Sequence, residues 1–246
     1  MTDENQAVKN GGGGSSCSGH KNVEIESKFA ITADTEGRVV EAGGTCVKQV
    51  SFHDAYFDTD SFQLTLADHW LRRRDGKWEL KVPLADHSKQ NKPETHTKYL
   101  EFDDEQNIIA NLSAILLTYA DDTIEVKVAD DDDKCMDTNL EKWLKMHHLN
   151  LEPFAEYTTN RKTFSMNGGV LIVLDETNFG FSVGEIEVMS RQSGDDVAEA
   201  EMKINEVVEK IGLGKQTVIE GKMGAYLKRF VPHRYETLIA RGILKR

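Results

Sequence analysis

Charged and apolar residues alternate along several short segments of this chain, and each segment has the residue types of a β-strand. Successive side chains of a strand point to opposite faces, so Glu24, Glu26 and Lys28 would share one face. Val23 and Ile25 would share the other face. The same alternation recurs at Arg72, Arg74, Glu79, Lys81, Arg161, Glu185 and Glu187. Any fold of this chain must therefore accommodate strands with one charged and one apolar face.

Segments of this kind are numerous, and turn residues such as Asp75-Gly76 separate several of them. They lie at 23–30, 47–52, 55–59, 69–74, 78–82, 95–102, 155–166, 170–175 and 181–189. Helices are expected at 105–119, 138–148 and 195–211, and at 218–243 with an interruption at Pro232. So many strands in one domain favour a closed barrel, because closure removes unpaired edges. The predicted fold class is therefore α+β, an antiparallel β-barrel with surrounding helices.

The alternation alone leaves open which way the charged face points. In a half-solvated sheet the charged face is simply the outer face. If the charged face instead points inward, the barrel interior becomes a polar tunnel, and helices would have to cover the apolar outer face. The basic stretch 69–82, within a chain of net formal charge −12, would then create a local site for anions.

An inward charged face would combine two kinds of binding group. Carboxylates suit a hard cation with oxygen ligands, and the candidates are Glu24, Glu26, Glu185 and Glu187. Guanidinium and ammonium groups suit phosphate oxygens, and the candidates are Lys28, Arg72, Arg74, Lys81 and Arg161. An unpaired buried charge costs several kcal/mol, so a ligand that neutralises both sets is expected. A metal–polyphosphate complex fits this description.

Composition restricts the remaining possibilities. The net charge of −12 argues against a general nucleic-acid binder. No apolar run approaches the roughly 20 residues of a membrane helix. Residues 1–20 are polar and glycine-rich, which predicts a disordered tail before a single domain at 21–246. The glycine run lacks the Lys-Ser/Thr ending of a phosphate-binding loop. Length and charge fit a monomer.

Other features of the sequence point to a cytoplasmic protein. The N-terminus lacks the charged-then-apolar pattern of a secretory signal. The three cysteines, Cys17, Cys46 and Cys135, are widely spaced and are expected to be free thiols in a reducing compartment. The acidic run 130–133 lacks the spacing of a calcium loop and is expected to be a solvated loop.

The segment 23–29 contains an E-x-E-x-K motif, which resembles the signature of the CYTH superfamily, the triphosphate tunnel metalloenzymes. Four further segments resemble strands of that superfamily: Y-F-D-T at 56–59, L-R-R-R at 71–74, W-E-L-K at 78–81 and G-E-I-E at 184–187. The resemblance extends over residues 22–230. Within the superfamily, the stretches 67–74, 179–187 and 226–230 are most similar to the animal thiamine-triphosphatases.

The resemblance implies an eight-stranded antiparallel tunnel and Mg²⁺-dependent hydrolysis of thiamine triphosphate to the diphosphate. It implies metal ligation by Glu24, Glu26, Asp175, Glu185 and Glu187. It implies substrate binding by Lys28, Arg72, Arg74, Lys81, Arg161 and Lys222, the last from a C-terminal helix. Among these residues, Lys28, Arg72 and Arg74 are the candidate catalytic groups.

Three further positions carry open questions. Trp70 shares a face with the basic residues of its strand and could stack on the thiamine rings, although core packing is the alternative. Glu101 could orient a basic side chain. Val173 stands where the related enzymes tend to have the first Asp of an Asp-x-Asp pair, so Asp175 would have to compensate.

Several functions share the tunnel and differ in substrate. The alternatives to a thiamine-triphosphatase are an inorganic tripolyphosphatase, a nucleoside triphosphatase and a polyphosphate-binding module without catalysis. The loss of an acidic residue at Val173 is the feature that favours the binding module. A structural barrel with a solvated charged face would bind neither Mg²⁺ nor a triphosphate.

Overall fold

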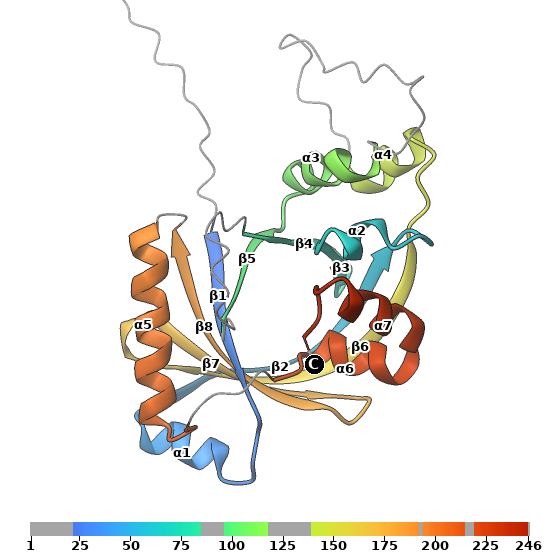
Figure 1. The fold of residues 1–246 in the computed structure, drawn as a ribbon. Coiled ribbons are helices and arrows are strands. Elements are labelled where there is room, and N and C mark those ends of the chain that lie inside the picture. The colour runs from blue at the N-terminus through green and yellow to red at the C-terminus, as the bar shows by residue number, and fades with distance from the viewer. Residues whose placement is uncertain (1–21, 85–95, 118–138, 192–193, 215–218, 246) are drawn as a thin grey trace, which may run out of the picture.

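Eight strands close into one antiparallel barrel (Figure 1), which confirms the predicted fold class. The computed structural model describes residues 22–84, 96–117, 139–191, 194–214 and 219–245. The strands are β1 (Asn22–Phe29), β2 (Thr45–Asp58), β3 (Trp70–Arg74), β4 (Lys77–Pro83), β5 (Thr97–Phe102), β6 (Glu152–Ser165), β7 (Val170–Thr177) and β8 (Ser182–Arg191). Their order around the barrel is β1, β5, β4, β3, β2, β6, β7, β8. The predicted tail at 1–20 and the acidic run at 130–133 lie outside the described residues.

The first and last strands of the barrel pair with each other over the whole length of β1. The register runs from Asn22 opposite Arg191 to Phe29 opposite Gly184. This pairing closes the sheet, and it brings the E-x-E motif of β1 beside the E-x-E motif of β8. Two segments from opposite ends of the domain thereby contribute to one part of the interior.

One predicted break in the strands is wrong. The segments 47–52 and 55–59 form a single strand, β2, which pairs with β3 and β6. His53 and Asp54 interrupt the apolar pattern there, and aspartate is depleted in strands. Asp54 nevertheless lies inside β2, fully buried, where a side chain of opposite charge pairs with it.

Seven α-helices surround the barrel in the described part of the chain. They are α1 (Thr35–Glu41), α2 (Gln63–Leu66), α3 (Glu105–Leu116), α4 (Leu140–Met146), α5 (Gly194–Lys210), α6 (Lys222–Phe230) and α7 (Pro232–Ala240). The predicted helices correspond to α3 to α7. The predicted interruption at Pro232 is correct, since this proline occupies the first turn of α7. The short helices α1 and α2 carry too few residues for a clear apolar period and were not predicted.

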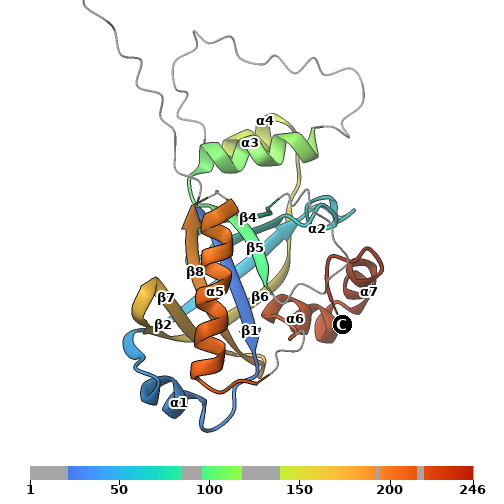
Figure 2. The same ribbon diagram turned by 60° about the vertical axis from the view of Figure 1, so that its left-hand side comes forward.

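The apolar face of the strands lies on the outside of the barrel, under the helices. Ile25 and Val188, on β1 and β8, belong to one apolar cluster with Ile204 of α5, which lies along these two strands (Figure 2). Ile108 of α3 joins the same cluster with Leu80 of β4. Each fully buried side chain of this size contributes about 1.5–3 kcal/mol. The charged face therefore points inward, which settles the orientation that the alternation left open.

The C-terminal helices are fixed to the barrel by a buried ion pair. Arg234 of α7 lies 3.4 Å from Asp58, at the end of β2, and its guanidinium packs between the rings of Phe62 and Phe154 at 3.8 and 4.0 Å. Asp58 also accepts hydrogen bonds from the backbone N–H groups of residues 64 and 65, at the start of α2. The same carboxylate thus anchors α2 and α7, and α7 in turn packs on α6.

Gly184 of β8 is required for close packing against β1. A Cβ atom at this position would lie 2.2 Å from the ring of Phe29, which is almost fully buried. We expect Gly184→Ala to lower the free energy of unfolding by about 1–3 kcal/mol, because the ring cannot move without disturbing the core. Urea-induced unfolding checks this. The matched control is Gly37→Ala in α1, where the added methyl meets nothing within 4 Å, and alanine favours the helix by up to about 1 kcal/mol. Equal effects of the two substitutions would contradict the packing argument.

Candidate active site

The interior of the barrel contains a cavity of about 430 Å³. All the residues that the sequence assigned to substrate binding line it, namely Lys28, Trp70, Arg72, Arg74, Lys81, Arg161 and Lys222. Four of the residues assigned to the metal also line it: Glu24, Glu26, Glu185 and Glu187. The alternating pattern on separate strands has therefore become one enclosed site.

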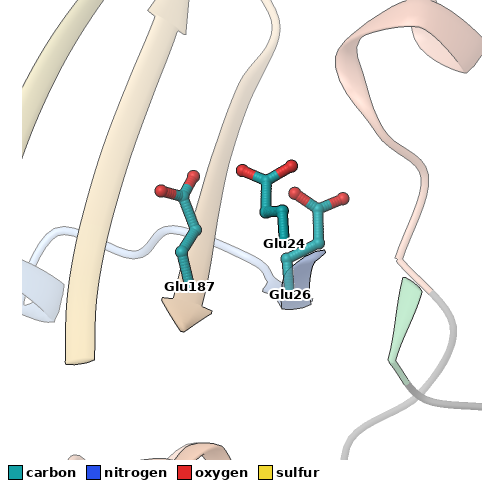
Figure 3. A group of neighbouring side chains, drawn as sticks. All are labelled: Glu24, Glu26 and Glu187. Carbon is teal, nitrogen blue, oxygen red and sulfur yellow. The ribbon is translucent and has the colours of Figure 1, made fainter. Parts of the chain in front are cut away.

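Three carboxylates of this site form a cluster. Glu24 and Glu26 of β1 and Glu187 of β8 each have an oxygen within 4.8 Å of the others, and Figure 3 shows the three groups pointing to the same side. Burial raises the pKa of Glu187 to about 8, and the neighbouring carboxylates add to this effect against the nearby Arg161 charge. Burial also raises the pKa of Glu24. Three carboxylates at this spacing, two of them on buried residues and one on a partly buried residue, fit a hard divalent cation, which would remove their mutual repulsion.

Asp175 and Glu185 lie outside this cluster, and both contact Arg161 and Lys222. Arg161 donates two hydrogen bonds of 2.7 Å to the carboxylate of Asp175. The amine of Lys222 lies 2.5 Å from Asp175 and 3.0 Å from Glu185. Burial raises the pKa of Glu185, but Lys222, Lys28 and Arg161 outweigh it and hold this pKa well below its usual range. Asp175 is fully buried behind these cations. The two carboxylates thus fix the positions of Arg161 and Lys222 in the cavity wall.

A second group of ion pairs lies on β2, β3 and β4. Arg74 donates two hydrogen bonds, of 2.7 and 2.8 Å, to Asp54. Arg72 donates one of 2.7 Å to Glu79, and its guanidinium lies 3.3 Å from the hydroxyl of Tyr56. These contacts hold both guanidinium groups extended along the cavity wall. The charges are therefore preorganised for an anion, since little side-chain freedom remains to be lost on binding.

Two lysines, Lys28 of β1 and Lys81 of β4, contact the carboxylates of β1. The amine of Lys81 pairs with Glu24 and lies 2.9 Å from Glu101. The expected role of Glu101 in orienting a basic side chain is consistent with this contact. Lys28 pairs with Glu26 and lies 3.5 Å from the hydroxyl of Thr97. Glu24 and Glu26 of β1 therefore each have a lysine partner.

One part of the cavity is apolar and aromatic. Trp70 and Tyr99 line it and belong to an apolar cluster with Met223 at the start of α6. Ile243 and Leu244, which follow α7, also line the cavity and belong to the same cluster. The indole of Trp70 is thus both packed and part of the cavity wall. The cavity offers a charged region for phosphates and an apolar region for an organic group.

Comparison with known proteins gives a family for this architecture. A model of the CYTH domain matches residues 22–221. The chain belongs to the CYTH domain family. It is similar to human thiamine-triphosphatase, with 31% identity over 226 residues that cover 88% of this chain and 89% of the relative. It is also similar to thiamine-triphosphatase of Macaca fascicularis, with 33% identity over 229 residues and the same coverage of both chains.

A solved structure of a protein from Pyrococcus horikoshii OT3 shares the fold. Its TM-score is 0.52 at 18% identity, and the match covers 86% of this chain and 99% of that chain. In the part of the CYTH chain that the structure describes, no helix is long and apolar enough to cross a membrane. Cys46 is an exposed free thiol, as expected, and Cys17 and Cys135 lie outside the described residues.

The CYTH site also uses residues that the sequence did not single out. Asp54 and Tyr56 share a face of β2, and this parity was the available signal for placing them in the tunnel. No strand alternation marks residues 243–245 as part of the cavity, because they reach it only through the turn after α7. Val173 is almost fully buried on β7, and it lies opposite Glu185 in the register. An acidic residue at position 173 would lie beside the carboxylate of Glu185, which already forms ion pairs with Lys222 and Arg161.

Proposed function

We propose that this protein is a Mg²⁺-dependent hydrolase that converts thiamine triphosphate to thiamine diphosphate and phosphate. The observation that carries the proposal is the composition of one enclosed cavity. The cluster of Glu24, Glu26 and Glu187 fits a hard cation, the arginines and lysines fit phosphate oxygens, and an aromatic region adjoins them. A bare inorganic polyphosphate would leave the aromatic region without a partner. The names of the human and macaque relatives support the thiamine compound as the organic partner.

The mechanism follows from where the charges lie. A water molecule would attack the terminal phosphorus, and the bond from that phosphorus to the bridging oxygen would break, releasing thiamine diphosphate. Charge spreads over the phosphate oxygens in the transition state, so catalysis depends on position and electrostatics. Arg72, Arg74 and Arg161 would bind these oxygens, with Lys28, Lys81 and Lys222 completing the positive wall. Preorganised donors of this kind stabilise developing charge more than flexible ones do.

The carboxylates of β1 and β8 would hold the metal. Glu24, Glu26 and Glu187 would be its ligands, with Glu185 within reach of the same region through its position on β8. When bound, Mg²⁺ would neutralise charge on the polyphosphate and lower the pKa of a bound water. The residues on the opposite walls keep the phosphates close to these carboxylates. Asp175, assigned to the metal from the resemblance, instead has the contacts of a group that orients Arg161 and Lys222.

Phosphate release from thiamine triphosphate, ATP and inorganic tripolyphosphate, each with Mg²⁺ and with a chelator, tests the proposal. We expect a preference for thiamine triphosphate that the chelator abolishes. A preference for tripolyphosphate or ATP would keep the tunnel chemistry and exclude the thiamine assignment. Binding of all three without release would instead establish a polyphosphate-binding module.

The affinity for Mg²⁺ is expected to rise with pH up to about 8. In the metal-free protein the pKa of Glu187 is raised to about 8 from an ordinary value of 4.5, so this carboxyl is protonated at neutral pH and must lose its proton to bind a metal. Affinity should therefore change by up to tenfold per pH unit below pH 8 and level off above it. Because the raised pKa makes the folded state bind more protons than the unfolded state, the stability of the metal-free protein should fall as pH rises from about 4.5 to 8.

Titration calorimetry at several pH values, in buffers of different ionisation enthalpy, measures both the affinity and the released proton. Glu187→Gln is the control, since it removes the titrating group while keeping the side-chain shape. We expect this variant to lose most of the pH dependence together with part of the affinity. An unchanged pH slope in the variant would mean that another group releases the proton.

A further inference from the structure

Asp68 joins two side chains of the cavity wall through a single oxygen. The indole N–H of Trp70 donates a hydrogen bond of 2.8 Å to its Oδ1 atom, and the hydroxyl of Tyr99 donates one of 3.0 Å to the same atom. Trp70 lies on β3 and Tyr99 on β5, and β4 separates these strands in the barrel. Backbone pairing therefore does not link the two rings directly, and the carboxylate does.

The carboxylate is itself held in place by the backbone around it. Asp68 has a φ of +59°, the left-handed conformation that aspartate tolerates better than most residues. It follows α2, and its N–H donates to the carbonyl of Thr65 at 3.1 Å, while the N–H of His69 donates to that of Leu64 at 2.8 Å. Asp58 fixes the start of α2 through the N–H groups of the same two residues. A chain of hydrogen bonds thus runs from β2 through α2 to the wall of the cavity.

Burial around Asp68 makes these two hydrogen bonds important for the orientation of the Trp70 and Tyr99 rings. The side chain of Trp70 is 8% exposed, and burial raises the pKa of Asp68. In such a place a lost partner leaves the remaining donors unsatisfied, which is unfavourable for the folded geometry. Indole and phenol rings with free donors would rotate or recruit water, and the apolar wall would lose its defined shape.

We infer that Asp68 is a positioning residue for substrate specificity, which fixes the rings of Trp70 and Tyr99 in the orientation that recognises the organic end of the triphosphate. This role rests on the proposed function, because the organic end is taken to be the cationic heteroaromatic group of thiamine. The hydrogen bonds engage the indole N–H and the phenol hydroxyl, which lie at the edges of the two rings. The faces of the rings therefore remain free to stack on such a group. Asp68 acts on the organic group only, since the phosphates are bound by the basic side chains elsewhere in the cavity.

Three variants test the inference. Asp68→Ala should raise KM for thiamine triphosphate by about 5- to 30-fold, which corresponds to about 1–2 kcal/mol of lost binding. It should change kcat and the turnover of inorganic tripolyphosphate by less than about twofold. Asp68→Asn should recover most of the affinity, because its amide oxygen can accept both hydrogen bonds. Asp104→Ala is the control: Asp104 also accepts a backbone hydrogen bond, but as the N-cap of α3 it lies outside the cavity, and KM should not change.

A spectroscopic readout tests the geometry without substrate. The chain has three tryptophans, so ¹⁵N-labelled indole gives few N–H resonances, and Trp70→Phe assigns the relevant one. This resonance should shift upfield in Asp68→Ala and stay near its original position in Asp68→Asn. An unmoved resonance in Asp68→Ala, or equal losses on thiamine triphosphate and tripolyphosphate, would overturn the role of Asp68. A wild-type protein that shows no preference for thiamine triphosphate would instead overturn the proposed function, whatever the resonance does.

Discussion

Replacement of Glu24 by glutamine is expected to lower Mg²⁺-dependent phosphate release by about 100-fold, because a metal ligand is lost from the cluster with Glu26 and Glu187. The fold should survive, since glutamine has the same shape as glutamate and Lys81 keeps its ion pair with Glu101. Burial raises the pKa of Glu24, so the folded protein holds a negative charge at this position less readily than the unfolded chain does. The metal-free variant is therefore expected to unfold at the same temperature as the wild type, or slightly above it.

The decisive comparison is the stabilisation by Mg²⁺. Wild-type protein should show a rise in melting temperature with increasing Mg²⁺, and Glu24→Gln should show little or none. Glu199→Gln, at an exposed site on α5 where the carboxylate pairs with Lys203, controls for the general loss of one negative charge. Full Mg²⁺-dependent activity in a folded Glu24→Gln protein would refute the metal assignment.

Replacement of Lys222 by alanine is expected to reduce kcat/KM for the triphosphate by about 100-fold and to lower the free energy of unfolding by about 3 kcal/mol. The side chain is 11% exposed and pairs with both Asp175 and Glu185. Removing one partner of a buried pair costs about 3–5 kcal/mol, and the lower end applies because Arg161 still pairs with Asp175. The loss of activity follows from the missing phosphate contact and from the freed start of α6.

Lys228→Ala provides the matched control on the same helix. Its side chain is 61% exposed and lies 3.6 Å from Glu220, so its removal should cost less than about 1 kcal/mol. Phosphate release and urea-induced unfolding of the two variants, measured together, separate the roles of the two lysines. Similar values for Lys222→Ala and Lys228→Ala would show that the buried contacts of Lys222 contribute neither to activity nor to stability.

The composition of each strand was predictable from the sequence, whereas the contacts between strands were not. Alternation placed Glu24, Arg72 and Glu187 on one face of their strands, and all of them face the tunnel. The direction of that face depended on whether helices cover the opposite side. Ile204 and its neighbours on α5 provide this cover over β1 and β8, but nothing in the pattern of α5 alone specifies which strands it covers.

The partner of each charge was the least predictable part of the site. The position of Asp175 suggested a metal ligand, yet its contacts are with Arg161 and Lys222, because the register of β6 against β7 places Arg161 directly opposite it. Asp54 lies between the two segments predicted as separate strands, 47–52 and 55–59. Its pairing with Arg74 depends on the register between β2 and β3, which is set by long-range pairing. Asp68 owes its role to a left-handed turn that sequence alone does not specify.

The pairing of β1 with β8 also ties the metal cluster to the order of folding. Glu24 and Glu26 leave the ribosome early, but their partner Glu187 is among the last strand residues to be synthesised. Joining them closes almost the whole length of the barrel sequence, a step with a large loop-closure entropy and therefore a slow one. A nascent or partly folded chain thus has only two of the three carboxylates in place. The appearance of tight Mg²⁺ binding during refolding should accordingly coincide with barrel closure and follow the formation of the local hairpins.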